Sequence, residues 1–264
     1  MGTGFAAGEE EWRSRLGTLR QVVRQAVVAR QLAECLPDLP PRRVLDIGCG
    51  QGTQALLLAR RGHVVTGLDS SVQLLDDFRA ALATEPAPVG ARVRLVQGEA
   101  AATAELFAPS SFDVVLCQGV LMYFPDPDPL LDAIAQVVVP GGMVSLLVRN
   151  GDALAMRPGL LGDWDRVGEA FDGLAYRNRI GVDARADRLD DLTAALARRR
   201  MPVSRWYGVR VFTDAAASDA PLPDGATLDA IVRSEEQAGR TDPYRRVAAL
   251  LHLIAMRRGD APGS

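Results

Sequence analysis

Histidine and cysteine are scarce in this sequence. Its 264 residues include only two histidines, His63 and His252, and three cysteines, Cys35, Cys49 and Cys117. All five lie within apolar runs, and the cysteines do not have the spacing of metal ligands. The sequence therefore predicts neither a metal site nor a histidine-based catalytic triad, and the cysteines indicate small buried side chains in a reducing cytoplasm.

Long apolar runs and a strong net charge are also missing. No stretch of 18 apolar residues occurs, so no transmembrane helix is predicted. The N-terminal stretch MGTGFAAGEEEWRSRLG lacks the apolar segment of a secretory signal. A net charge of −3 is not typical of a general nucleic-acid binder, although it leaves room for a local basic patch. We expect a cytoplasmic globular protein with no membrane contact.

Strands and helices alternate over residues 43–150. Near-continuous apolar runs predict buried strands at 42–48, 63–69, 91–99, 111–120 and 143–150. Helical spacing predicts helices at 53–61, 71–83 and 130–139, and an amphipathic helix at 16–36. Apolar strands that alternate with helices are typical of a parallel sheet covered on both faces.

The regular alternation of strands and helices ends after residue 150. We expect a partly helical insertion at 151–181, helices at 187–200 and 226–238, and strands at 203–212 and 247–257. The expected chain is a single domain (1–264) with four regions. These are an N-terminal helical cap (1–42), a cofactor-binding core (43–150), a substrate-side insertion and helix (151–200) and C-terminal strands (201–258).

Three glycines stand between the first strand and its helix, in VLDIGCGQGTQALLLA. A dinucleotide-binding turn of the form G-x-G-x-x-G would place its last glycine at Thr53. Asp46 precedes the first glycine, and a carboxylate there suits a cationic ligand better than a pyrophosphate. Asp69, at the end of the second strand, can accept hydrogen bonds from the ribose of either kind of cofactor.

The pattern Asp46-x-Gly48-x-Gly50-x-Gly52 resembles motif I of the class I S-adenosylmethionine (SAM)-dependent methyltransferases. The stretches VQGEAA, FDVVLCQGVLMY and PGGMVSLLV resemble later segments of that family, in the same order. The resemblance implies SAM as cofactor. It also implies an α/β, Rossmann-like fold: a mostly parallel seven-stranded sheet with helices on both faces, whose final strands form an antiparallel edge.

The resemblance also implies which residues contact the cofactor. In this sequence they are Arg24, Asp46, Gly48, Cys49, Gly50, Asp69, Ser70, Glu99, Ala100, Cys117 and Gln118.

A narrower resemblance extends over nearly the whole chain. The stretches LRQVVRQAVVARQL, WYGVRVFTD and EEQAGRTDPYRRVAALLHLIAMR resemble the bacterial tRNA 5-carboxymethoxyuridine methyltransferases, which esterify the carboxyl group of a modified uridine. A carboxylate acceptor needs cations or hydrogen-bond donors to position it, and no general base. Arg149 and Arg210 interrupt or end apolar strands, where open α/β sheets bind ligands. With Asn150 and Tyr244, they are the acceptor-side candidates.

Other readings stay open at this point. Thr213 and Ala215 stand where that family has His and Tyr, and the chain is mildly acidic, which favours a small-molecule O- or N-methyltransferase of secondary or lipid-related metabolism. An oxidoreductase that uses NAD and a SAM-binding protein without catalysis are further alternatives. The partners expected are SAM and either tRNA or a small acceptor, and the sequence does not predict the oligomeric state.

Overall fold

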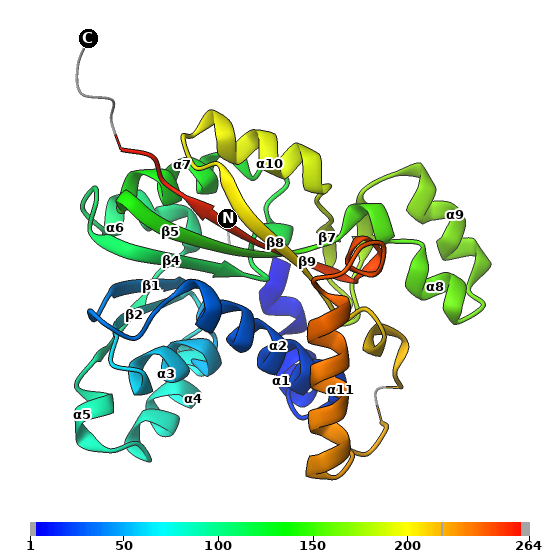
Figure 1. Ribbon diagram of the computed structural model, residues 1–264, viewed down its shortest axis with the longest axis horizontal. Helices are drawn as coiled ribbons and strands as arrows, with labels where there is room; N and C mark the ends of the chain where they lie inside the picture. Colours follow the sequence, from blue (N-terminus) through cyan, green and yellow to red (C-terminus); the bar gives the residue numbers. More distant parts are fainter. Residues whose placement is uncertain (1–3, 218, 260–264) are drawn as a thin grey trace.

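The computed structural model describes residues 4–217 and 219–259. Its main feature is a seven-stranded sheet with the strand order β3-β2-β1-β4-β5-β9-β8 (Figure 1). The strands are β1 (Arg43–Ile47), β2 (Val64–Asp69), β3 (Val93–Gln97), β4 (Phe112–Gln118), β5 (Val138–Arg149), β8 (Val203–Val209) and β9 (Leu250–Met256). Strands β1 to β5 pair in parallel, and β9 pairs antiparallel with β5 and β8. The expected fold class is confirmed, including the antiparallel edge.

Helices cover both faces of this sheet. One face carries α2 (Leu19–Cys35), α3 (Thr53–Arg60), α4 (Val72–Ala83), α5 (Ala87–Gly90) and α11 (Gly225–Ala238), and the other carries α6 (Thr103–Leu106), α7 (Asp128–Val137) and α10 (Leu189–Arg198). Along β4, Val114 and Leu116 pack into the first layer and Val115 and Cys117 into the second. This alternation is why the strand is apolar at every position.

Local sequence accounts for several element boundaries. Ser71 caps α4 because its hydroxyl oxygen accepts a hydrogen bond from Leu74 N at 3.1 Å. The helix expected at 130–139 ends earlier, at Val137, because Val138 already pairs with Phe112 in the sheet. The strand expected at 247–257 begins only at Leu250, after a short 3-10 turn.

The segment between β5 and β8 contains more than the expected helices. It has α8 (Met156–Leu160) and α9 (Trp164–Asp172), followed by an antiparallel hairpin of β6 (Ala175–Arg177) and β7 (Asp183–Arg185). The 3-10 turns are η1 (Gly4–Gly8), η2 (Ala100–Ala102), η3 (Leu121–Tyr123), η4 (Gly151–Ala153), η5 (Thr213–Ala215) and η6 (Tyr244–Val247). The hairpin was not predicted from the sequence.

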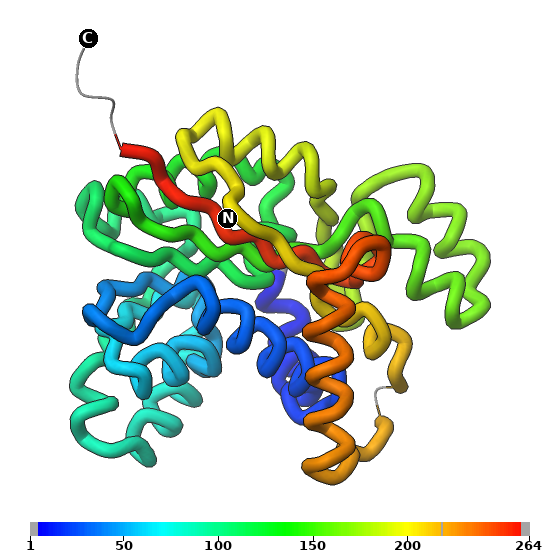
Figure 2. The backbone as a smooth tube through the Cα atoms, viewed as in Figure 1, coloured from blue at the N-terminus to red at the C-terminus, as the bar shows by residue number. Residues whose placement is uncertain are grey.

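The N-terminal part of the chain lies near its C-terminal part. After η1, α1 (Glu9–Ser14) leads into α2, and Figure 2 shows the orange tube of α11 beside these dark-blue helices. Residues from both ends of the sequence therefore meet at one side of the sheet. Within the described ranges, no helix is both long and apolar enough to span a bilayer.

Candidate functional site

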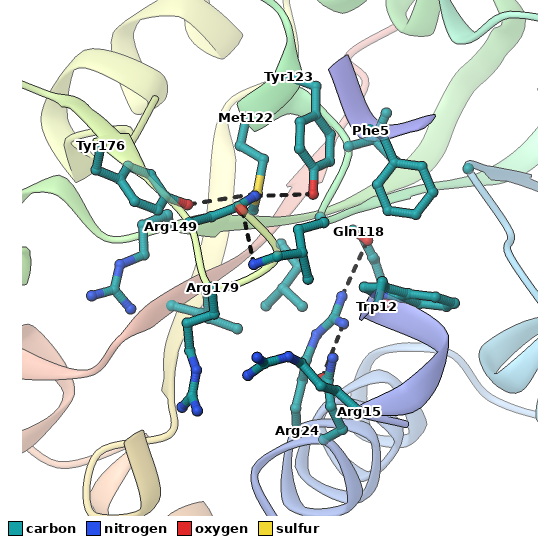
Figure 3. Close-up of a pocket in the computed structure, with 18 of the residues that line it drawn as sticks. Phe5, Trp12, Arg15, Arg24, Gln118, Met122, Tyr123, Arg149, Tyr176 and Arg179 are labelled. Atoms are coloured by element: carbon teal, nitrogen blue, oxygen red, sulfur yellow. Dashed lines mark hydrogen bonds between the residues drawn. The ribbon is translucent and has the colours of Figure 1, made fainter. Parts of the chain in front are cut away.

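A cavity of about 390 Å³ opens at the carboxyl ends of the parallel strands. Its lining includes the segments after β1, β2, β3 and β4 and the last residue of β5, Arg149. Chain order reverses between the neighbouring strands β1 and β4, and open α/β sheets bind ligands at such a switch point. The N-terminal segment, α8, α9 and the β6–β7 hairpin complete the lining. Figure 3 shows Phe5 and Trp12 on one side of the cavity and Tyr176 and Arg149 on the other.

The glycine turn has a backbone that only glycine adopts readily. Gly48, Gly50 and Gly52 have φ angles of +68°, +54° and +82°. A Cβ on Gly52 would come within 2.3 Å of the Phe78 ring, so side chains are excluded on steric grounds as well. Gly50 N donates a hydrogen bond to Asp69 Oδ2 at 2.8 Å, which ties the turn to the end of β2.

Asp69 organises two backbone segments at once. Its second oxygen, Oδ1, accepts a hydrogen bond from Ser71 N at 2.9 Å, while Oδ2 holds the glycine turn. Burial raises the pKa of Asp69, and hydrogen bonds from Ser71 N and Gly50 N oppose that rise. The carboxylate lies in the cavity lining beside Ser70, where it has lone pairs left to accept further hydrogen bonds.

Asp46 lies behind the turn in a drier environment. Only 5% of it is exposed, and it lines a smaller hollow next to the cavity together with Cys49 and Arg24. Burial and the nearby Asp69 raise the pKa of Asp46 to about 7, against the lowering effect of Arg24. Burial and Arg210 lower the pKa of Arg24 to about 10, and Arg24 Nη2 donates a hydrogen bond to Gln118 O at 3.2 Å.

Aromatic side chains from the N-terminal segment cover part of the cavity. The ring of Phe5 lies 5.9 Å from Trp12 and 5.5 Å from Tyr123, with edge-to-face geometry in both pairs. A Cβ on Gly50 would come within 3.2 Å of the Trp12 ring, so this ring lies against the glycine turn. Phe5, Trp12 and Tyr123 were not predicted as site residues from the sequence. Two large rings in an otherwise polar terminal segment were the available signal.

Four arginines of the lining converge on one carboxylate. Arg20 Nη2 donates to Asp214 Oδ1 at 2.6 Å, and Arg149 Nη1 donates to Asp214 Oδ2 at 3.3 Å. Arg210 Nη2 lies 3.5 Å from Asp214 Oδ1, and Arg157 Nε donates to the backbone oxygen of Asp214 at 3.1 Å. We call these four arginines and Asp214 the arginine cluster.

The arginine cluster has an excess of positive charge. A single carboxylate faces four guanidinium groups, and the buried Nε atoms of Arg20, Arg149 and Arg210 have no hydrogen-bond partner within the described ranges. Burial lowers the pKa of Arg210, and the neighbouring Arg149 adds to the effect. The described lining as a whole contains nine arginines and four acidic residues. This end of the cavity is therefore suited to an anion.

Most of the residues expected at the site lie around this cavity. Its lining includes Arg24, Gly48, Gly50, Asp69, Ser70, Glu99, Ala100, Gln118, Arg149 and Arg210. Asp46 and Cys49 line only the smaller hollow. Within the described residues, no group of three or more His, Cys, Asp or Glu side chains could hold a metal ion.

Three of the expected residues are not part of the lining. Cys117 is fully buried among apolar side chains, because consecutive residues of β4 face opposite ways and Gln118 takes the cavity position. Asn150 Nδ2 donates to the backbone oxygens of Arg246 and Ala248 at 2.9 Å each, so its amide holds the chain before β9. Tyr244 is 50% exposed and lies outside the cavity.

The sequence matches known methyltransferases. A family model described as "methyltransferase domain" matches residues 45–146. The tRNA 5-carboxymethoxyuridine methyltransferase of Escherichia coli is 29% identical over 245 residues, which are 92% of this chain and 91% of that protein. A ubiquinone biosynthesis O-methyltransferase of Paracidovorax citrulli is 38% identical over 180 residues, which are 66% of this chain and 74% of that protein.

Solved structures show the same fold. An S-adenosylmethionine-dependent methyltransferase from Listeria monocytogenes superposes with a TM-score of 0.59 at 18% identity, covering 89% of this chain and 99% of that one. A Burkholderia thailandensis 1,6-didemethyltoxoflavin-N1-methyltransferase, solved with S-adenosylhomocysteine, gives a TM-score of 0.60 at 19% identity, with coverages of 97% and 84%. The chain thus belongs to the SAM-dependent methyltransferases and is similar over nearly its full length to the tRNA 5-carboxymethoxyuridine enzyme.

Proposed function

We propose that the protein transfers the methyl group of SAM to a carboxylate, and that this is the carboxyl group of 5-carboxymethoxyuridine in tRNA. The observation that supports the acceptor class most strongly is the arginine cluster. Its four cations, of which Arg20 and Arg149 are buried, have one carboxylate within 4.0 Å and lie in the same cavity as the glycine turn. An anionic acceptor would supply the charge that the cluster lacks, through charge-assisted hydrogen bonds.

The residues present fit SAM on the other side of the cavity. In this proposal, the backbone at Gly48 and Gly50 approaches the methionine part, Asp69 accepts hydrogen bonds from the ribose, and Arg24 pairs with the carboxylate of the cofactor. Glu99 and Ala100 flank the adenine. SAM supplies an electrophilic methyl group that a nucleophile displaces from sulfur.

The residues of the chain would position the acceptor and balance its negative charge. A carboxylate is ionised at neutral pH, so it attacks without losing a proton and needs no general base. The arginine cluster would hold one carboxylate oxygen and leave the other directed at the methyl group. The product of the transfer would be a neutral methyl ester, and the S–C bond pair would remain on the sulfur of the thioether product.

The phenols of the lining and the two histidines agree with chemistry that needs no base. Burial raises the pKa of Tyr123 to about 12 and also raises that of Tyr176, so both phenols keep their protons at neutral pH. Both histidines are fully buried, and burial lowers the pKa of His252 to about 3. The phenols can donate hydrogen bonds to an anion, but they do not take up protons.

A second function has its own support. The rings of Phe5, Trp12, Tyr123 and Tyr176 form an aromatic part of the lining, which would suit a small aromatic acceptor. The ubiquinone biosynthesis relative fits this reading. A small-molecule O- or N-methyltransferase would accept such a compound without needing its negative charge.

The two functions can be separated by methyl transfer to matched substrates. We expect transfer from labelled SAM to tRNA that carries 5-carboxymethoxyuridine and none to the same tRNA without the carboxyl group. Arg210→Lys loses the planar fork of donors and should lower kcat/KM for this tRNA about 10- to 100-fold, with SAM affinity little changed. Arg246→Lys, at an exposed arginine outside the cavity, is the control. Equal transfer to both tRNAs, or to neither, would contradict the proposal.

A further inference from the structure

A line of buried polar side chains runs from the cavity into the sheet. Gln118, in the cavity lining, donates through Nε2 to Ser145 Oγ at 3.1 Å. Ser145 Oγ lies 2.8 Å from His252 Nε2, and His252 Nδ1 lies 2.7 Å from Gln31 Oε1. Gln31 Nε2 donates to Gly208 O at 3.4 Å. Gln31, Ser145 and His252 are completely buried, so these contacts are their means of satisfying polar atoms.

The donor and acceptor roles along this line follow from its inner end. A backbone carbonyl only accepts, so the NH₂ group of Gln31 must face Gly208 O and its oxygen must face His252. His252 Nδ1 therefore carries the ring proton. Because burial keeps the pKa of His252 at about 3, the ring is neutral, and Nε2 has only a lone pair to offer.

The donor and acceptor roles nearer the cavity follow from the tautomer of His252. His252 Nε2 accepts from the hydroxyl of Ser145, and the Ser145 oxygen is left to accept from an outside donor. Gln118 supplies that donor with its NH₂ group, as the 3.1 Å contact between Nε2 and Oγ shows. The amide oxygen of Gln118 remains for the cavity. The reversed arrangement would bring the oxygen of Gln31 against Gly208 O with no hydrogen between them.

We propose that Gly208, Gln31, His252 and Ser145 form a hydrogen-bond relay that positions Gln118 with its amide oxygen facing the cavity. An acceptor oxygen there favours a positively charged ligand. SAM has a sulfonium charge that its product S-adenosylhomocysteine lacks, so the oriented oxygen favours the methyl donor over the product. This inference rests on the SAM-dependent class of the protein and is independent of the acceptor.

The tautomer of His252 tests the relay in the ligand-free protein. The chain has only two histidines, so ¹⁵N NMR of the ring nitrogens can be assigned by comparison with His63→Gln. We expect the proton of His252 on Nδ1. His63 is an internal control with the opposite tautomer, because its Nδ1 accepts from Arg42 N at 3.2 Å. A proton on Nε2 of His252 would overturn the inference, whether or not any variant folds.

The effect on the ligand is tested by calorimetric titration with SAM and with S-adenosylhomocysteine. Ser145→Ala leaves the Gln118 amide free to turn, so the preference for SAM over S-adenosylhomocysteine should fall about three- to tenfold, the worth of one neutral hydrogen bond. Gln118→Leu removes the oxygen itself and should act in the same direction. Ser204→Ala is the matched control, since its hydroxyl also donates within the sheet, to Ile254 O at 3.1 Å.

An unchanged ratio of the two dissociation constants in Ser145→Ala and Gln118→Leu would overturn the proposed preference. These readouts do not involve an acceptor. A failure to methylate tRNA would therefore leave the relay intact, and a failure of the relay would not alter the case for a carboxylate acceptor.

Discussion

At the scale of single residues, Asp214 is the carboxylate that balances the charge of the arginine cluster. It is 7% exposed and lies among four arginines, of which Arg20, Arg149 and Arg210 all approach its carboxylate within 3.5 Å. Removing one partner of a buried ion pair leaves an uncompensated charge in the protein interior, where the dielectric constant is low. The cluster therefore holds together only while an anion is present in it.

We expect Asp214→Asn to lower the free energy of unfolding by about 3–5 kcal/mol, because the buried guanidinium groups then repel one another without a counter-charge. Chemical denaturation measures the change. Added sulfate should restore part of the loss by taking the place of the carboxylate. Asp242→Asn, at an exposed aspartate paired with Arg245, should cost far less. Equal losses in the two variants would refute this view of the cluster.

Asp69 is expected to support cofactor binding directly and through the turn. Asp69→Ala removes the acceptor for Gly50 N and Ser71 N, and SAM affinity should fall by about 1.5–3 kcal/mol, the worth of hydrogen bonds to a charged group. Isothermal titration gives the value. Asp76→Ala, in the same region but paired with Arg79 on the surface of α4, is the control. Unchanged affinity in Asp69→Ala would mean that the carboxylate only ends the strand.

The raised pKa of Asp46 predicts that both the stability of the fold and the affinity for SAM depend on pH. With its pKa raised from 3.8 to about 7, the folded ligand-free protein holds a proton that the unfolded chain releases, so this group stabilises the fold at low pH and that contribution is lost between about pH 4 and pH 7. A cationic ligand favours the ionised carboxylate. SAM affinity should therefore rise as the pH increases through about 7, and Asp46→Asn should flatten this rise. Identical pH profiles would exclude Asp46 as its source.

The position of a residue in or after an apolar strand predicted some of the cavity residues and missed others. Arg149 and Arg210 were identified because each interrupts or ends an apolar strand, and both line the cavity. Asn150 follows Arg149 directly, but its amide is used by backbone oxygens, which no sequence pattern indicates. Asp214 was missed because its role depends on Arg20, which is 194 residues away in the chain.

At the scale of elements, α11 holds the loop that carries Arg210. Arg210 has a φ of +61°, a strained value for a residue with a side chain. The buried carboxylate of Glu235 in α11 accepts hydrogen bonds from Val211 N at 2.6 Å, Phe212 N at 3.0 Å and Thr213 N at 2.7 Å. These bonds fix the loop between Arg210 and the rest of the cluster.

Glu235→Gln should release this loop. The new NH₂ group would face backbone N–H donors, leaving at least one unsatisfied at a cost of about 1–3 kcal/mol in unfolding free energy. In the proposed function, KM for the acceptor should also rise while SAM affinity is little changed. Glu236→Gln, on the neighbouring surface position paired with Arg30 and Arg240, is the control. If both variants have the same KM, α11 does not hold the loop.

A helix or strand could be predicted where the local spacing of apolar residues determines it, and could not where tertiary packing does. The longer strands and helices of 43–150 were predictable because apolar spacing alone determines which residues are buried, whereas the four-residue helices α5 and α6 are too short to show a periodicity and were not predicted. The β6–β7 hairpin has three-residue strands with charged residues at several positions, so no periodicity marks it. The N-terminal turn depends on tertiary packing, such as the contact of Gly8 with Ile180.

At the scale of the whole molecule, a mildly acidic chain encloses a cationic cavity. The net charge is −3, yet arginines outnumber acidic residues nine to four in the described lining. Composition averages over the surface and gives no information about one cavity, so the charge balance does not weigh against an anionic acceptor. Membership of the methyltransferase family also removes the NAD-dependent alternative.

The chemistry of the product shows whether the methyl group goes to a carboxylate held by the arginine cluster. The protein is incubated with methyl-labelled SAM and tRNA carrying 5-carboxymethoxyuridine, and the purified tRNA is treated with mild alkali. We expect label in the tRNA that alkali releases as methanol, because a methyl ester hydrolyses. Label that resists alkali, or transfer only to a neutral phenol or amine, would contradict it.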